Sequence, residues 1–156
     1  MLPTSTAWTT RFPSLAPIFA AKPALVGLLF ATSWCPDCWP VVPRIKGLVK
    51  AFDGTADLSI VYISSDDTAE QMASYKPAVL AEIPFANVEE RSDLKRLTKT
   101  CARKEMTAVG MTSREHGTPT LILLNAETGA TLTADGVKDV MELAPVDVLA
   151  KWKALL

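Results

Sequence analysis

Short apolar runs alternate with helical spacings along most of this chain. Ala24 to Ala31 is a continuous apolar run that follows Pro23, and residues 58–63 form a second run that ends at four polar residues. Apolar runs of this length between turn-forming residues predict buried strands of a central sheet. We therefore expect two neighbouring strands at the centre of the fold.

A helix is expected to begin within residues 35–38 and to continue after them. Pro36 suits the first helical position, whereas Pro40 and Pro43 are expected to remove interior hydrogen bonds and to bend this helix. Its inward face is predicted from apolar residues at three- to four-residue spacing, which are Val42, Ile45, Val49 and Phe52.

The rest of the chain predicts further helices and one hairpin. The hairpin pairs residues 121–124 with 131–133 through a turn-forming stretch. Helices are expected over residues 68–75, where Asp67 and Thr68 offer capping oxygens, over 92–101, and from Pro145 with Leu149, Trp152 and Leu156 on one face. Residues 1–23 are expected to be irregular with a short helical turn. This order implies an α/β fold, a three-layer α/β/α sandwich with a mixed central sheet.

Length and charge restrict the class of protein. A chain of 156 residues with 49% hydrophobic content forms a sizeable core, so we expect a single domain over 1–156 in which 1–23 is an N-terminal extension. The formal net charge of −1 gives no indication of a nucleic-acid partner or a membrane surface. We expect a monomer.

The cysteine content indicates a redox compartment. Three cysteines are too few for the disulfide framework of a small secreted protein. A reducing, cytoplasmic location is therefore expected. Residues 1–36 contain no Asp or Glu, which faintly resembles a transit peptide, so mitochondrial targeting stays open as the alternative.

The candidate chemistry lies in Cys35-Pro36-Asp37-Cys38, between the first strand and the following helix. Unpaired backbone N–H groups and the helix dipole stabilise a thiolate at a helix N-terminus. Two intervening residues place the second sulfur one turn above the first, within disulfide reach. The motif predicts a dithiol/disulfide centre in which Cys35 is the nucleophile and Cys38, one turn deeper, is the resolving thiol.

Other interpretations of these cysteines stay open at this stage. A structural zinc site needs about four ligands, and only Cys101 and His116 remain in the chain. Cys35, Cys38 and His116 form a workable soft-ligand set for copper binding or transfer. The pair is also compatible with two inert buried cysteines, or with a redox-sensing interaction protein whose docking surface includes Trp39.

Several segments together resemble one known family. They are residues 30–38 (FATSWCPDC), Pro43, residues 60–66 (IVYISSD), residues 83–85 (IPF) and residues 117–121 (GTPTL). The chain resembles the thioredoxin fold, and within it the nucleoredoxin/tryparedoxin branch. The WCPDC stretch is also similar to the small thioredoxin-related proteins.

The resemblance implies a function and a set of site residues. It implies reduction of protein disulfides, with an upstream reductase or low-molecular-weight thiol as partner and no cofactor or metal besides the Cys35–Cys38 disulfide. It also implies that the Thr118-Pro119 peptide bond is cis and faces the disulfide, with Trp34 flanking it. Pro36 and Asp37 complete the expected support of the site.

The chain departs from the family pattern before the motif. Thioredoxins have a buried carboxylate six residues before the first cysteine, where this chain has Leu29. Asp37 is then a candidate proton shuttle for Cys38, although a solvated residue of the first helical turn explains it equally.

A second departure is the length of the segment 102–116, which we interpret as an insertion before the proline loop. It contains Arg103, Lys104, Arg114 and His116. We expect either a solvated basic loop or a substrate selector that prefers acidic partners. Arg114, His116 and Trp39 are the candidate substrate-binding residues, and Trp39 is open to the alternative of a core position.

Overall fold

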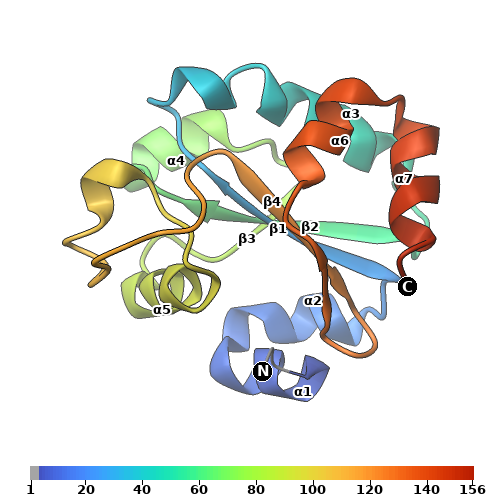
Figure 1. The fold of residues 1–156 in the computed structure, drawn as a ribbon, viewed down its shortest axis with the longest axis horizontal. Helices are drawn as coiled ribbons and strands as arrows, with labels where there is room; N and C mark the ends of the chain where they lie inside the picture. Colours follow the sequence, from blue (N-terminus) through green and yellow to red (C-terminus); the bar gives the residue numbers. More distant parts are fainter. Residues whose placement is uncertain (1–3) are drawn as a thin grey trace.

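A computed structural model describes residues 4–156 (Figure 1). Within these residues five strands form one sheet in the order β3-β2-β1-β4-β5. β1 (Leu25–Ala31) is parallel to β2 (Leu58–Ser64), and β2 is parallel to β3 (Ala81–Glu82). β4 (Thr120–Asn125) is antiparallel to both β1 and β5 (Thr131–Thr133). The predicted mixed central sheet and its hairpin are confirmed.

Helices cover both faces of the sheet, which confirms the three-layer arrangement (Figure 1). One face packs against α3 (Val41–Ala51), α4 (Ala69–Tyr75), α6 (Gly136–Glu142) and α7 (Pro145–Lys153). The other packs against α1 (Ser5–Arg11), α2 (Ala16–Ala20) and α5 (Val88–Thr98). The short 3₁₀ helices are η1 (Pro13–Leu15), η2 (Pro36–Cys38) and η3 (Arg103–Glu105). No helix of residues 4–156 has the length and apolarity needed to span a membrane.

The N-terminal helices belong to the core, so the prediction of an irregular segment is wrong there. Trp8, Phe12 and Leu15 are almost completely buried, against the face of β1 that carries Val26 and its same-side neighbours. Trp8 lies in α1, Phe12 follows its last residue and Leu15 ends η1, so the apolar spacing of this segment is divided between two short helices. Burial of three large side chains is what makes this segment regular.

α5 starts and ends earlier than expected. It covers Val88–Thr98 rather than 92–101, and Lys99 ends it with a left-handed backbone at φ 52°. A left-handed residue is a common way to end a helix. Cys101 therefore follows the helix, where it is fully buried.

The expected bend in the helix after the motif is wrong. α3 begins only at Val41, with Pro40 as its N-cap and Pro43 in its first turn. The first N–H groups of a helix have no intrahelical acceptor, so neither proline removes an interior hydrogen bond. Pro36 begins the separate 3₁₀ helix η2.

The C-terminal part has one helix that the pattern did not predict. A side chain at Gly136 would meet the Leu121 carbonyl oxygen at 2.8 Å, so the absence of a Cβ lets α6 lie directly on β4. α7 begins at Pro145 and buries Leu149 and Trp152, as expected. Leu156 lies beyond the end of α7 and is 52% exposed, so its predicted place on the buried face is wrong.

Candidate active site

The two motif cysteines lie where β1 gives way to η2. Cys35 is the N-cap of η2 and is 8% exposed, whereas Cys38 is completely buried. Both are free thiols, and the Cys35 thiol donates to the Thr118 carbonyl oxygen at an S···O distance of 3.7 Å. Cys35 therefore keeps a small exposed fraction while Cys38 has none, which is the order of depth that the motif predicts.

Burial distinguishes the second thiol chemically. It raises the pKa of Cys38 to about 12, and the neighbouring Cys35 acts in the same direction. Cys38 is then a neutral thiol near neutral pH. Only the thiolate attacks a disulfide, so Cys35 is the better placed of the two to react first.

The loop opposite the cysteines contains the cis bond that the resemblance implied. The Thr118-Pro119 peptide bond is cis, which confirms that prediction. Its Thr118 carbonyl is the acceptor for the Cys35 thiol. Two segments far apart in the sequence therefore meet at the reactive sulfur.

The predicted supporting residues divide into packed and exposed groups. Trp34 is half-buried and its Nε1 donates to the Ser65 carbonyl at 3.2 Å. Pro36 and Asp37 are exposed. Trp39 is 54% exposed, with Nε1 donating to the Ser33 carbonyl at 2.8 Å, so the alternative of a core position is wrong.

A buried carboxylate organises the approach to the motif, and the sequence analysis gave it no role. Asp66 is 6% exposed and accepts from the Thr32 hydroxyl at 3.0 Å and from the Ser33 N–H at 2.8 Å. Its other oxygen accepts from the Ser64 hydroxyl at 2.8 Å. These bonds tie the segment before Cys35 to the end of β2. The polar run after β2 was the available signal, but a helix cap explained it as well.

Two tyrosine hydroxyls lie buried in the core cluster that contains Cys38. Tyr62 pairs with Leu29 across the β1–β2 register, beside the position of the thioredoxin carboxylate. Within the described residues, the hydroxyls of Tyr62 and Tyr75 have no hydrogen-bond partner. Burial raises both pKa values, that of Tyr75 to about 12. Near neutral pH both hydroxyls are protonated.

The 102–116 segment is anchored beside this site by a second ionic group. Glu105 pairs with the Lys95 ammonium, which is 1% exposed, and also accepts from the Ser65 hydroxyl. Burial lowers the pKa of Lys95, while Glu105 opposes that shift. Neither residue carried a recognisable signal in the sequence, because their meeting depends on the packing of α5 against η3.

The two candidate binding residues of this segment, Arg114 and His116, differ in whether they line a cavity. Arg114 donates to the Cys101 carbonyl at 2.8 Å and lines a cavity with Trp34 and Thr118. His116 is held through its backbone, which accepts from the Cys101 N–H at 3.2 Å, and it does not line that cavity.

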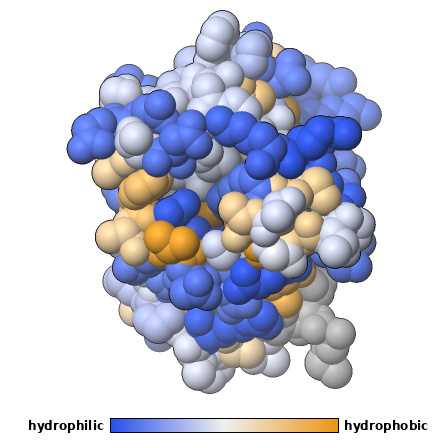
Figure 2. Space-filling view, turned by 90° about the vertical axis from the view of Figure 1, so that its left-hand side faces the viewer, coloured by the Kyte–Doolittle hydropathy of each residue, from blue (hydrophilic) through white to orange (hydrophobic). Residues whose placement is uncertain are grey.

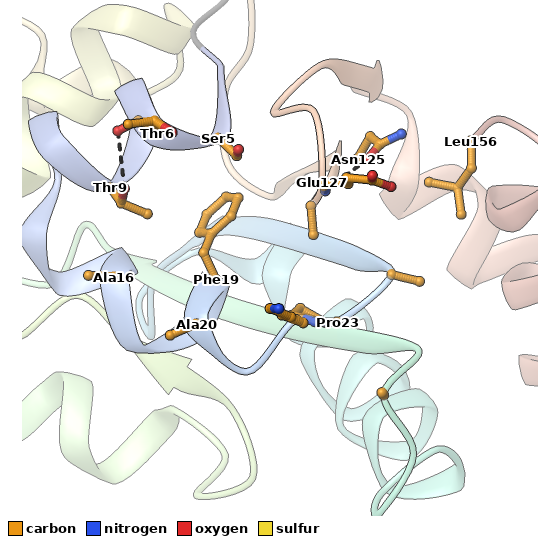
Figure 3. A pocket seen from close by; sticks show the side chains of 14 residues that line it. Ser5, Thr6, Thr9, Ala16, Phe19, Ala20, Pro23, Asn125, Glu127 and Leu156 are labelled. Atoms are coloured by element: carbon orange, nitrogen blue, oxygen red, sulfur yellow. Dashed lines mark hydrogen bonds between the residues drawn. The ribbon is translucent and has the colours of Figure 1, made fainter.

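A second cavity lies at the other end of the sheet. It measures about 900 Å³ and is lined by α1, α2, the turn after β4 and Leu156 (Figure 3). Figure 3 shows mainly small, apolar and hydroxyl side chains around it, with Phe19 and Glu127 among them. It contains no cysteine, so the chemistry of the motif does not occur there.

The copper interpretation has no support in this arrangement. Within residues 4–156, no three or more His, Cys, Asp or Glu side chains are grouped so that they could hold a metal ion. Cys35 and Cys38 therefore have no third ligand of these types.

Comparison with known proteins agrees with this geometry. The model of a thioredoxin-like family matches residues 23–130. The chain belongs to this thioredoxin-like family. The match includes both cysteines and the cis bond, so the CxxC motif of this thioredoxin-like protein lies within the family region.

Individual relatives are tryparedoxins. The chain is 29% identical over 119 residues to the tryparedoxin of Trypanosoma brucei brucei, covering 75% of this chain and 72% of the relative. Tryparedoxin II of Crithidia fasciculata has a TM-score of 0.65 at 22% identity, with 90% of each chain covered. A solved Trypanosoma brucei tryparedoxin has a TM-score of 0.60 at 25% identity, and the match covers 79% of this chain and 76% of that one. These likenesses support the tryparedoxin part of the predicted resemblance, and the nucleoredoxin part stays a prediction.

Proposed function

We propose that this protein is a thiol–disulfide oxidoreductase that reduces protein disulfides through Cys35 and Cys38. The observation that supports it most is the pairing of a Cys35 thiol that keeps 8% exposure, 3.7 Å from the Thr118 carbonyl, with a Cys38 that is completely buried. The tryparedoxin relatives support the same class of reaction.

The reaction divides between the two sulfurs. The Cys35 thiolate attacks one sulfur of the substrate disulfide, that bond breaks, and the leaving sulfur departs as a thiolate that takes up a proton. Cys38 then loses its proton and attacks the Cys35 sulfur, so the mixed disulfide breaks and the second substrate thiol leaves. The substrate gains two electrons and two protons, and Cys35 and Cys38 end as a disulfide.

The recharging partner is proposed to be a thiol. One solved tryparedoxin II is complexed with glutathionylspermidine. We extend this class to the present chain, with a low-molecular-weight thiol or an upstream reductase returning two electrons to the Cys35–Cys38 disulfide. Such a cycle requires a reducing compartment, and we propose the cytoplasm.

A single-turnover experiment tests the assignment without any upstream partner. The reduced protein is mixed with a neutral disulfide, 2-hydroxyethyl disulfide, and released thiols are counted together with the state of the cysteines. We expect one substrate disulfide reduced per protein and a Cys35–Cys38 bridge formed. Cys35→Ser should give no reaction, and Cys38→Ser should trap a mixed disulfide that excess dithiothreitol releases. Equal trapping by both variants would contradict the assigned order.

The same experiment separates catalysis from redox sensing. A redox-sensing protein binds partners through a surface such as Trp39 without repeated turnover. With dithiothreitol as reductant, the Cys35→Ser variant measures the direct reduction of the substrate by dithiothreitol. Continued thiol release faster than this background supports an oxidoreductase, and release that returns to the background after a single event supports the sensor.

A further inference from the structure

A cavity adjoins the proposed nucleophile on the side of the 102–116 segment. It measures about 500 Å³ and is lined by Trp34 and Thr118, the two residues that flank the Cys35 thiol, and by Gly117. The segment 102–116 lies on the side of the molecule that carries α5 (Figure 1), and Figure 2 shows that side as mostly hydrophilic, with hydrophobic atoms at a hollow. A group held in this cavity is next to the sulfur under attack.

The remaining wall of the cavity is positively charged. Arg103, Lys104 and Arg114 line it, and no carboxylate is among its lining residues. The chain as a whole has a net charge of −1, so this is a local concentration of positive charge. Such a concavity attracts anions and raises their rate of encounter.

Two of the three cations, Lys104 and Arg114, are held in place by contacts of their side chains. The Lys104 ammonium lies 4.0 Å from the Trp34 ring centroid and 3.2 Å from an Asp67 carboxylate oxygen. The Lys104–Asp67 pair is more than half exposed, so it leaves much of the ammonium available to solvent or a ligand. Arg114 uses one guanidinium nitrogen on the Cys101 carbonyl, at 2.8 Å. A planar guanidinium has further donors for a carboxylate.

The Lys95–Glu105 ion pair fixes the backbone beneath this wall. Arg103 and Lys104 are the first two residues of η3, and Glu105, the third, turns inward to Lys95. The Glu105 carboxylate also accepts from the Ala102 N–H at 2.7 Å. The turn therefore presents two cations outward from a firmly held backbone, which reduces the ordering cost of binding.

We propose that this cavity binds a carboxylate of the substrate, so that the protein prefers disulfides whose reacting sulfur is flanked by negative charge. The proposal rests on the proposed function, because the carboxylate is recognised while Cys35 attacks the neighbouring sulfur. The substrate is then an anionic disulfide. It is either the disulfide of a small peptide thiol or a disulfide in an acidic segment of a protein.

Rates of single-turnover reduction with matched disulfides test this proposal. The probes are glutathione disulfide, which is anionic, 2-hydroxyethyl disulfide, which is neutral, and cystamine, which is cationic. The variant is Arg103→Gln with Lys104→Gln, and the control is Lys46→Gln with Lys50→Gln on the exposed side of α3. The measured quantity is the rate constant for the anionic disulfide divided by that for the neutral disulfide. This division cancels any difference in intrinsic Cys35 reactivity between the variants.

We expect the cavity variant to lower this ratio about three- to tenfold at low salt, and to raise the cationic-to-neutral ratio. The control should keep both ratios. The difference should fade in 1 M salt, where the screening length is about 3 Å. Since Lys104 contacts Trp34, Arg103→Gln alone provides a milder variant whose ratio should move in the same direction.

Two peptide disulfides identify the source of the anion. One has Glu on both sides of the cysteine and the other has Gln. If the cavity variant lowers only the Glu-to-Gln rate ratio of the peptides, the anion belongs to an acidic protein segment. If it lowers only the ratio for glutathione disulfide, the anion belongs to a small thiol. Unchanged ratios with every probe would overturn the proposal while leaving the oxidoreductase function intact. A wild-type protein that reduces no neutral disulfide would refute the proposed function instead.

Discussion

The two ends of the central sheet are held by different kinds of contact. At the end with Cys35, the charged groups of Asp66 and Lys95 are buried, and the partly buried Glu105 pairs with Lys95. Toward the opposite end, α1 and α2 pack on the sheet through large apolar side chains, and the cavity of about 900 Å³ lies beside them. Burying charge is costly unless it is paired, whereas apolar burial is favourable by itself. Cavity size therefore does not locate the chemistry here; the buried polar groups do.

The sharpest test of this contrast is the ion pair under the 102–116 segment. Glu105→Gln leaves the Lys95 ammonium buried without its charge partner, so we expect a loss of about 3 kcal/mol in the free energy of unfolding. The measurement is urea denaturation near neutral pH. Lys95→Met combined with Glu105→Leu should recover most of the loss, since it removes both charges. A small loss in Glu105→Gln would mean that the reactive end is not held by this pair.

Alkaline pH should weaken the reduced protein through the buried thiol. The pKa of Cys38 is raised to about 12 when folded, against about 8.5 for an unfolded cysteine. Its contribution to stability is fully present below about pH 8.5 and is lost at about 1.4 kcal/mol per pH unit as pH rises toward 12.

Cys38→Ala isolates this contribution. Burial also raises the pKa values of Cys101, Tyr62 and Tyr75, so the whole protein shows the same trend. Between pH 9 and 11 the free energy of unfolding of the wild type should fall faster than that of Cys38→Ala. The difference should be about 1.4 kcal/mol per pH unit, the value for one titrating group. Parallel curves in denaturation measured across this range would show that Cys38 is not shielded from water.

A substitution at the end of the sheet opposite Cys35 should change the stability of the protein but not its reaction rate. Trp8 is buried and its Nε1 donates to the Gly129 carbonyl at 2.8 Å. Trp8→Phe removes that bond, and we expect a loss of about 1–2 kcal/mol. The single-turnover rate with 2-hydroxyethyl disulfide should match the wild type under folding conditions. A changed rate would show that the two ends are coupled.

The smallest effect is expected at the unpartnered tyrosine. Among residues 4–156 the buried Tyr62 hydroxyl has no hydrogen-bond partner, so Tyr62→Phe removes a group that makes no hydrogen bond there. The free energy of unfolding should change by less than about 1 kcal/mol, or increase. Tyr75→Phe removes a hydroxyl of the same kind and should give the same result. A loss of several kcal/mol in thermal or urea unfolding would reveal a hydrogen bond through an internal water.

The strands and the motif could be predicted because their signals are local. The runs that became β1 and β2 are apolar over nearly their whole length, and burial on both faces leaves no alternation to misinterpret. Cys35 and Cys38 were placed by spacing and by the strand before them. α6 escaped prediction because its place depends on Gly136 fitting against Leu121, a contact between segments rather than a pattern.

By itself, then, the sequence determined the class of fold, the position of the CxxC pair and the proline loop expected to face it. Each of these depends on residues within a few positions of one another. Only the tertiary structure brought Asp66 to the Thr32–Ser33 segment and Lys95 to Glu105, and set the cations of η3 beside Trp34. The physical reason is that a buried charge is stable only with its partner, and that partner is chosen by how the chain packs.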